Sequence, residues 1–520
     1  MRAMMRVIVR VDASALLGAG HVMRCLALAG ELKNRGHQVV FVMRPLRGHM
    51  MVETKAAGFD VLGLPDLQLF AANSQAEWIK NSRAPDAQQR DASETLALLP
   101  LRSWDWLLVD HYALGAQWQL AVGVAAQKIL VIDDQADRAL HCDLLLNQNP
   151  GANIESYAGL IPLGSQTLIG PHYALLRPEF ASRTNPVRGL SHPSAAARVL
   201  VSLGGVDPHG LALQVVSALA DCGFRGSGVT VLAGNHSPHE QELLSTGQDL
   251  GFVGLKSTNS MAQLMSQADW AVGAGGVSLL ERCAMGLPSI ALAIAPNQQP
   301  GVAAAQAAGA VLALDPFGAG FAELLRQAIQ SLLTEPERLK AMSQAATSLC
   351  DGRGTVRVAN ALQAGALALR VATLQDAPAL YAWRNALETR QHSGDGLAFS
   401  LEQHIQWMSG VLADPARRLW IASTTAGAVG VLRFDSRPEG AATTAEISVY
   451  RVPGQLGQGW GRALIARGVE EAQRTWLGLR RVDAHISDDN LPSLGAFAAC
   501  GFSASALSGL YQKNIEGFPL

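Results

Sequence analysis

The residues near the N-terminus that are best suited to chemistry belong to a glycine-rich turn carrying one histidine, His21. Gly18 and Gly20 supply flexible backbone for this turn, which follows an apolar strand and precedes a helical period. Free N–H groups at the start of a helix attract anions, and the same positive end disfavours an imidazolium. We therefore expect His21 to be a neutral general base beside a phosphate. A histidine that merely caps its helix is the alternative interpretation.

A second glycine-rich turn, in the middle of the chain, has the pattern of a pyrophosphate site. Gly273, Gly275 and Gly276 follow an apolar strand, and a helix is expected to start near Ser278. Backbone amides and the helix dipole would then face the loop and attract an anion. Glu281 lies one turn into that helix, where its carboxylate can accept both hydroxyls of a ribose. The alternatives are an ordinary strand-to-helix turn and a solvated carboxylate.

Two parallel sheets are needed to position these turns. Apolar runs of strand length alternate with helical periods from residue 6 to about residue 161, and the pattern restarts at residue 198. Such runs are typical of parallel strands covered on both faces. Two open sheets in tandem imply a cleft between their carboxyl edges, where ligands bind. The second sheet also carries the glycine turn SLGGVDPHG, and two such turns on one sheet favour a nucleoside diphosphate.

The chain is expected to form an α/β structure of three domains, because its 520 residues suffice for about three. We assign an N-terminal Rossmann-like domain with the histidine to residues 1–162 and a second, nucleotide-binding Rossmann-like domain to residues 163–365. A helix over residues 351–365 is expected to close the second domain. Residues 366–520 read as a separate α+β domain.

Composition excludes several classes of protein. The formal net charge is -2 with both signs interspersed, which argues against a nucleic acid or an anionic membrane as partner. The hydrophobic fraction of 49% is sufficient for three cores. The six cysteines lie far apart without paired ligand spacing, so we expect neither a disulfide framework nor a metal site. The N-terminus enters a strand directly, which favours a cytoplasmic protein.

Several motifs occur in order between residues 6 and 362: GAGHVMRCLALA, VDHYAL, VIDDQADRALHCDLLLNQN, LIGPHYALLRPEF, SLGGVDP, ADWAVGAGGVSLLERCAMGLPS and the Asn297-Gln298-Gln299 loop. In register they resemble the UDP-2,4-diacetamido-2,4,6-trideoxy-β-L-altropyranose hydrolases of pseudaminic acid biosynthesis. The resemblance implies a glycosyltransferase-B-like fold and metal-free hydrolysis of a UDP-sugar at C1 with inversion. It implies that His21 is catalytic. The expected substrate-binding residues here are Asp12, Gly20, Tyr112, Gly275, Gly276, Ser278, Glu281, Asn297 and Gln298.

Elementary chemistry agrees with that implication. Inversion by water needs a base on the face of the sugar opposite the departing nucleotide, and a neutral His21 suits this role. Amides of the glycine loop and of the helix start can stabilise charge on the leaving UDP. Asp12 can orient His21, bind a sugar hydroxyl or be a simple turn residue, whereas we assign Asp110 a structural role. Val277-Ser278-Leu279 replaces the Ser-Thr-Thr of many relatives, so we expect mainly backbone contacts to phosphate there.

The last part of the chain carries WRNALETR, LEQHIQWM, GVLRFD, AEISVYRVPG, LGQGWGRALI and NLPSLGAFAACGF. Over nearly all of residues 368–520 these motifs resemble the GNAT acetyltransferases. The resemblance implies acetyl-CoA as co-substrate, with its pyrophosphate held by amides of a glycine loop. The Trp-Arg-Asn opening is similar to members that acetylate 4-amino nucleotide sugars, which implies substrate contacts for Trp383 and Arg384. The expected cofactor-binding residues are Gly457, Gln458, Gly459, Gly461 and Asn490.

Two positions depart from the pattern of that superfamily. Leu456 stands where the loop usually begins with Arg or Gln, and Phe497 stands where many members have a general-acid tyrosine. Phenylalanine cannot protonate a leaving thiolate, so water, Tyr511 or a solvent proton would have to do so. Glu446 is the candidate base for the sugar ammonium, and a surface strand residue is the alternative.

We therefore expect a bifunctional enzyme that N-acetylates the 4-amine of UDP-4-amino-4,6-dideoxy-N-acetyl-β-L-altrosamine and then hydrolyses the product. The expected partners are a UDP-sugar, acetyl-CoA and other enzymes of the nucleotide-sugar pathway, without nucleic acid or membrane. Two alternatives remain open. The first part can be a UDP-sugar glycosyltransferase of similar fold, and the GNAT-like part can bind its cofactor without turnover.

Overall fold

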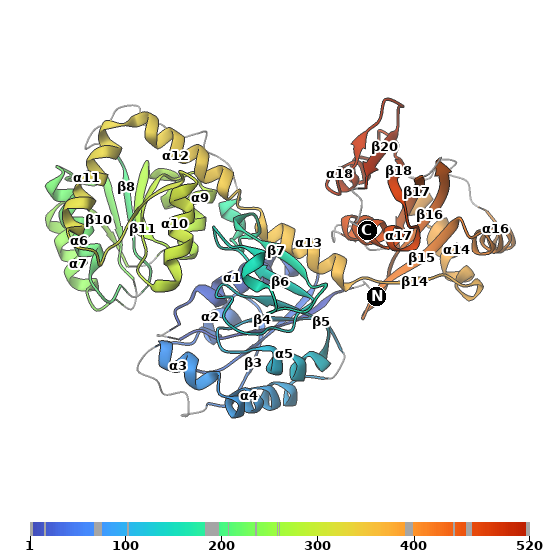
Figure 1. Ribbon diagram of the computed structural model, residues 1–520, viewed down its shortest axis with the longest axis horizontal. Coiled ribbons are helices and arrows are strands. Elements are labelled where there is room, and N and C mark those ends of the chain that lie inside the picture. The colour runs from blue at the N-terminus through green and yellow to red at the C-terminus, as the bar shows by residue number, and fades with distance from the viewer. Residues whose placement is uncertain are drawn as a thin grey trace.

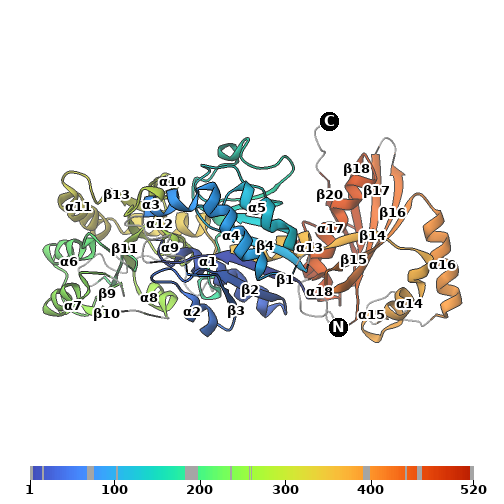
Figure 2. The same ribbon diagram turned by 90° about the horizontal axis from the view of Figure 1, so that it is seen from below.

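The computed structural model (Figure 1) describes residues 4–14, 17–66, 75–100, 103–181, 197–205, 207–234, 237–256, 258, 260–390, 399–439, 442–453 and 460–515. Three β-sheets follow one another along the chain, and the first lies between the other two in both views (Figures 1 and 2). In the described part of the chain, no helix combines the length and apolar character needed to span a membrane. The predicted α/β architecture with a final α+β domain is confirmed.

The first sheet has seven strands, all parallel, in the order β3-β2-β1-β4-β5-β6-β7. Its strands are β1 (Arg6–Val11), β2 (Gln38–Met43), β3 (Asp60–Gly63), β4 (Trp104–Asp110), β5 (Ala126–Ile132), β6 (Leu144–Asn147) and β7 (Gln166–Ile169). The helices between them are α1 (Gly20–Asn34), α2 (Met51–Ala56), α3 (Gln75–Ser82), α4 (Pro85–Ala97) and α5 (Ala116–Val122). Strand order reverses between β1 and β4, so the residues after these two strands share the switch point where ligands bind in open sheets.

The second sheet has six parallel strands in the order β10-β9-β8-β11-β12-β13. They are β8 (Val199–Ser202), β9 (Val229–Leu232), β10 (Val253–Leu255), β11 (Trp270–Ala274), β12 (Ser289–Leu292) and β13 (Val311–Leu314). Its helices are α6 (Leu211–Asp221), α7 (Glu240–Asp249), α8 (Met261–Gln267), α9 (Val277–Ala284), α10 (Gln299–Ala307), α11 (Phe321–Thr334) and α12 (Pro336–Leu349). The switch point of this sheet lies between β8 and β11, beside the predicted glycine loop.

The first sheet extends beyond the boundary predicted at residue 162, because β7 pairs with β6 from Gln166 to Ile169. Helix α13 (Gly354–Ala366), which we expected to close the second domain, also returns to the first sheet. There the indole of Trp106 donates a hydrogen bond to the carbonyl of Leu362 at 2.8 Å. The first departure has a simple cause, since β7 is a four-residue edge strand with one buried residue and its apolar pattern is therefore weak.

The third sheet is mixed, in the order β14-β15-β16-β17-β18-β20-β19. Its strands are β14 (Ala368–Val371), β15 (Arg417–Thr424), β16 (Gly427–Glu439), β17 (Ala442–Arg451), β18 (Leu479–His485), β19 (Ser503–Ala504) and β20 (Leu510–Asn514). Its helices are α14 (Ala377–Asn385), α15 (Leu387–Arg390), α16 (Leu401–Ala413), α17 (Trp460–Thr475) and α18 (Leu491–Ala498). β17 and β18 run parallel and pair only as far as Glu446 and Asp483 in the described residues, whereas β17 continues to Arg451.

The third domain packs directly on the first through α13 and α17. Trp460, the first residue of α17, is fully buried, and its ring centroid lies 5.3 Å from that of His37. Gln363 on α13 hydrogen-bonds the same His37 ring at 2.9 Å. Thr425 of the third domain donates its hydroxyl to the carboxylate of Asp105, the second residue of β4, at 3.0 Å. One continuous apolar core therefore spans both domains.

We predict that Gly365→Ala on α13 lowers thermal stability. A Cβ at Gly365 would overlap the rigid indole of Trp106, and such overpacking costs about 1–3 kcal/mol. Gly410→Ala on α16 is the matched control, because a Cβ there meets no atom within 4 Å. Alanine is favoured over glycine within a helix by about 0.5–1 kcal/mol, so the control should be neutral or stabilising. Equal melting temperatures for the two variants would contradict the close packing of α13 on β4.

Candidate functional site

A cavity of about 230 Å³ lies between loops at the carboxyl edges of the first two sheets. One wall comes from the residues after β1, β4, β5 and β6, and the other from the residues after β11 and β12. Many of the site residues predicted from the sequence line this cavity: Gly20, His21, Tyr112, Gly275, Gly276, Asn297 and Gln298. The structure therefore brings the histidine turn and the glycine-rich turn to one site, as the tandem sheets predicted.

His21 is the second residue of α1 and is held in place by a carboxylate. Its Nδ1 lies 2.5 Å from Oδ1 of Asp110, the last residue of β4. The ring of Tyr112 stands perpendicular to the imidazole, with centroids 4.4 Å apart. His21 is only 7% exposed, so the ring has little freedom to turn away from the cavity.

Arg24, one helical turn beyond His21, determines the ionisation of Asp110. Arg24 donates from Nε and Nη2 to the two oxygens of Asp110 at 2.7 and 2.6 Å. Burial opposes ionisation of Asp110, but Arg24 and His21 outweigh it and hold the pKa of this carboxyl well below its usual range. An ionised carboxylate can only accept, so Nδ1 of His21 is the donor in this contact. Nε2 is then the basic nitrogen.

Of the roles left open for Asp12, orientation of His21 is not the one that the structure shows, because Asp110 holds the imidazole. Asp12 is 2% exposed, lies 2.7 Å from Arg10 Nη1 and accepts from the amide of Arg44 at 2.8 Å. It belongs to a buried network outside the cavity. Asp110, to which we assigned only a structural role, takes the orienting position. The reason is strand order, because α1 passes beside the end of β4 as well as that of β1.

The opposite wall is the loop between β11 and α9. The amide of Gly275 donates to the carbonyl of Leu292 at 2.9 Å and to Oε1 of Gln298 at 3.2 Å. A Cβ at Gly275 would overlap Val302, so the close approach of α10 requires glycine there. Asn297 donates from Nδ2 to the hydroxyl of Tyr112 at 3.2 Å, which joins the two walls across the cavity.

Ser278 and Glu281 do not line the cavity. The Ser278 hydroxyl donates to the carbonyl of Ala274 at 3.3 Å, within its own turn. The Glu281 side chain is 16% exposed and lies 4.0 Å from Arg177. Burial raises the pKa of Glu281, and Arg177 opposes this shift. Phosphate contact by Ser278 and ribose contact by Glu281 therefore stay predictions.

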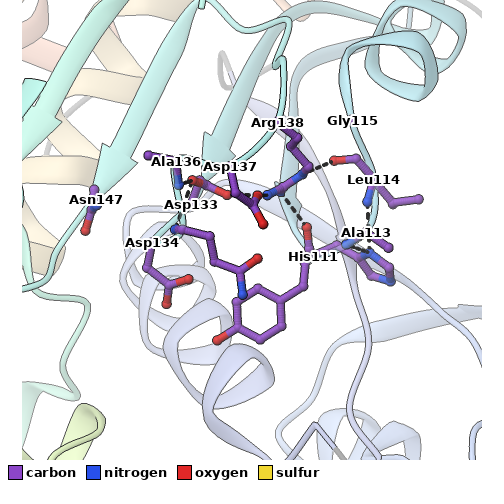
Figure 3. A network of polar contacts seen from close by, with 12 residues as sticks. His111, Ala113, Leu114, Gly115, Asp133, Asp134, Ala136, Asp137, Arg138 and Asn147 are labelled. Atoms are coloured by element: carbon purple, nitrogen blue, oxygen red, sulfur yellow. Dashed lines mark hydrogen bonds and ion pairs between the residues drawn. The ribbon is translucent and has the colours of Figure 1, made fainter. Parts of the chain in front are cut away.

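Asp134 on the cavity wall was missed by the sequence analysis. Figure 3 shows its carboxylate standing apart from a network in which Asp133 accepts from the amide of Ala136 at 2.8 Å and from Arg138 at 2.7 Å. Arg138 also donates to the carbonyl of His111 at 2.9 Å, so this network fixes the loops on either side of the cavity wall. Oδ1 of Asp134 is buried without a hydrogen-bond partner among the described residues. The sequence signal that could have identified Asp134 is the pair Asp133-Asp134 directly after β5.

Two of the five expected cofactor residues of the third domain lie in the described part of the chain. Gly457, Gln458 and Gly459 lie outside the described residues, and Gly461 lies in the first turn of α17. Asn490 caps α18, accepting from the amide of Ser493 at 3.2 Å. Across the described chain, no group of three or more His, Cys, Asp or Glu side chains is arranged to hold a metal ion.

Glu446 occupies the last recorded pair between β17 and β18, where the strands begin to diverge. Its carboxylate lies 3.4 Å from Arg437 and is 28% exposed. Phe497 is buried against Phe502, with ring centroids 5.0 Å apart, and carries no proton to donate. Tyr511 lies on β20, beside β18. The two candidate proton-transfer groups thus flank the strand at which the sheet opens.

A second cluster of aromatic residues lies between α14 and α16. The His404 ring is stacked between Phe399 and Trp407, with centroid distances of 5.5 and 5.4 Å. Burial lowers the pKa of His404, and the nearby charge of Arg384 lowers it further. Trp383 packs against the small apolar core of the third domain.

Comparison with known proteins supports the division into two parts. Residues 378–502 match the model of the Acetyltransferase (GNAT) family. The UDP-2,4-diacetamido-2,4,6-trideoxy-beta-L-altropyranose hydrolase of Campylobacter jejuni is 27% identical over 216 residues, which cover 41% of this chain and 66% of that protein. The spore coat polysaccharide biosynthesis protein SpsG of Bacillus subtilis is 26% identical over 358 residues, covering 66% of this chain and 94% of that protein.

Among solved structures, MurG of Acinetobacter baumannii aligns with 69% of this chain and 99% of its own length, at 16% identity and a TM-score of 0.46. Both resemblances inferred from the sequence are confirmed: the N-terminal region is homologous to the altropyranose hydrolase and to SpsG, and the C-terminal region carries a GNAT acetyltransferase domain.

Proposed function

We propose that the first two domains hydrolyse a UDP-sugar at C1 with inversion, and that the substrate is UDP-2,4-diacetamido-2,4,6-trideoxy-β-L-altropyranose. One observation carries the proposal: His21 is fixed by the ionised Asp110 on one wall of a cavity whose other wall is a glycine-rich strand-to-helix turn. A positioned base facing an anion-binding loop suits attack by water on the carbon that carries a diphosphate.

In this mechanism, a water molecule loses a proton to Nε2 of His21 while its oxygen bonds to C1 of the sugar. The bond between C1 and the diphosphate oxygen breaks, and its electron pair leaves with UDP. Asp110 stabilises the imidazolium that forms, since it stays ionised and hydrogen-bonded to Nδ1. The amides at Gly276 and at the start of α9 stabilise the added charge on the leaving diphosphate.

The third domain supplies the preceding step in this proposal, transfer of an acetyl group from acetyl-CoA to the 4-amine of the UDP-sugar. Glu446 removes the ammonium proton through a water molecule, and the free amine bonds to the thioester carbonyl. The C–S bond then breaks, the coenzyme A thiolate takes a proton from water or from Tyr511, and the nitrogen gives its surplus proton to water or to the Tyr511 oxygen, which leaves a neutral amide. The match to the GNAT family and the divergence of β17 from β18 at Glu446 support this step.

The test is to incubate the purified protein with the 4-amino UDP-sugar, with and without acetyl-CoA, and to follow UDP and coenzyme A. Coenzyme A release followed by UDP release, without any acceptor other than water, supports both activities. UDP release only in the presence of an added acceptor would identify a glycosyltransferase instead. Absence of coenzyme A release would leave the third domain as a binding module.

We predict that His21→Asn lowers the rate of hydrolysis by about 10²–10⁴, because one general base is lost while the binding contacts remain. UDP affinity and thermal stability should change little. His172→Asn is the matched control, since this histidine is exposed at the surface of the same part of the chain. Near-normal turnover by folded His21→Asn would remove His21 from the mechanism.

We predict that Asp110→Asn lowers the free energy of unfolding at neutral pH by about 3 kcal/mol, because buried Arg24 loses its nearest carboxylate and keeps only Asp134, 3.6 Å away. Folding lowers the pKa of Asp110, so its contribution is fully present above the unfolded pKa of about 4 and is lost as the pH falls below that value. Urea unfolding should therefore show a constant deficit at neutral pH that narrows in acid. A deficit in the free energy of unfolding that did not change with pH would contradict the ionisation of Asp110. Asp137→Asn, at an exposed aspartate of the same domain, is the control.

For acetyl transfer, we expect Glu446→Gln to lower the rate at neutral pH by about 10²–10⁴, with a smaller deficit at high pH. The deficit shrinks because the amine loses its proton in solution as the pH rises. Glu439→Gln, an exposed residue of the neighbouring strand, serves as control. A deficit that stays constant with pH would assign Glu446 a structural pairing with Arg437 rather than proton transfer.

A further inference from the structure

Four arginines are buried in the described residues, and one of them differs from the rest. Arg10, Arg24 and Arg44 each lie within 2.7 Å of a buried carboxylate oxygen. Arg282 is 1% exposed, yet no carboxylate lies within 4.0 Å of it in the part of the chain that the structure describes. Its positive charge is therefore buried without a partner of opposite sign.

The contacts of Arg282 are all to neutral groups. Nη2 donates to the carbonyl of Ala274 at 2.9 Å, Nη1 to the hydroxyl of Ser278 at 3.3 Å, and Nε to the hydroxyl of Ser289 at 3.2 Å. These bonds satisfy the guanidinium as a donor, but none of them brings a negative charge into contact with it; the charge of Glu281 acts on Arg282 only from beyond ion-pair distance. The adjacent carboxylate, Glu281, is directed toward Arg177 at 4.0 Å.

Burial lowers the pKa of Arg282 to about 10, so the side chain remains a cation at neutral pH. A buried charge without a counter-charge destabilises a fold, and replacing such a group by an apolar one of similar size is commonly neutral or stabilising. An uncharged donor could make the same three hydrogen bonds to Ala274, Ser278 and Ser289. The presence of a cation here therefore points to an anion that arrives from outside the chain.

The location of the guanidinium indicates where that anion binds. A Cβ at Gly273 would overlap Nη1, so Arg282 lies directly against the end of β11. Its contacts to Ala274 and Ser278 span the loop from the strand to the first turn of α9. Gly275 and Gly276, between those two contacts, line the cavity. The charge is thus behind the cavity wall, separated from the cavity by the loop itself.

We propose that Arg282 is a positioning residue for a nucleoside diphosphate. The negative charge of the diphosphate would compensate the buried guanidinium from the other side of the loop. The guanidinium braces the loop so that its amides face the diphosphate, and its charge adds to the field of the α9 N-terminus. In the reaction, this fixed charge stabilises the electron pair that departs with UDP, without contact between Arg282 and the ligand. The inference rests on the proposed function, since it assumes that UDP occupies this loop.

The test compares Arg282→Met and Arg282→Lys with the wild-type protein by calorimetry against UDP and uridine. Arg282→Met should raise the Kd of UDP by about tenfold or more, because a charge interaction at low effective dielectric is lost. The Kd of uridine should be unchanged, and the melting temperature should be unchanged or higher. Arg282→Lys should recover part of the UDP affinity. Arg326→Met is the control, because Arg326 is an exposed arginine of the same domain.

Other outcomes overturn the inference. Equal loss of UDP and uridine affinity with a lower melting temperature, or failure of Arg282→Met to fold, would make Arg282 a structural brace alone. Unchanged UDP affinity in folded Arg282→Met would remove any electrostatic role. If the wild-type protein binds no UDP, the proposed function fails and takes this inference with it, whereas wild-type binding with an unaffected variant refutes the inference alone.

Discussion

The ionised carboxylate of Asp110 is the interaction on which the arrangement of the first domain's site depends. It accepts two hydrogen bonds from Arg24 and one from His21, all three groups being buried between α1 and β4. Arg24 and Asp110 compensate each other's charge within the domain, and the contact through Nδ1 fixes the orientation of the His21 ring. The same contacts fix the start of α1 against the end of β4. The same contacts therefore both orient the His21 ring and hold α1 at the switch point of the first sheet.

The two walls of the cavity differ in whether their buried arginines have carboxylate partners. The first domain pairs its buried arginines with its own aspartates, which preorganises the histidine before any ligand binds. The second domain presents glycine amides backed by Arg282, which has no anionic partner in the described residues. The first wall has its charges paired without a ligand, and we propose that an anion completes the second. A sugar diphosphate bound between the walls would lie with its sugar near His21. Its diphosphate would supply the negative charge that Arg282 lacks.

The third domain shares a core with the first rather than hanging from a flexible linker. Trp460 begins the helix expected to bind the pyrophosphate of acetyl-CoA, and it is buried against His37 and α13. Helix α13 covers β4 at Trp106, and β4 ends at Asp110. Elements that belong to the two proposed activities, among them β1, α13 and α17, thus share one apolar core.

Local sequence determined the elements and the backbone of both turns, because apolar period, glycine and helix start are properties of neighbouring residues. His21 after Gly20, and Gly275 and Gly276 before α9, were predictable for this reason. Tertiary structure decided the partners. Asp110 rather than Asp12 holds His21, and β7 joins the first sheet, because strand order brings distant residues to a shared edge. Periodicity carries no information about that order, so the charge pairs that tune the site appear only once the sheets have assembled.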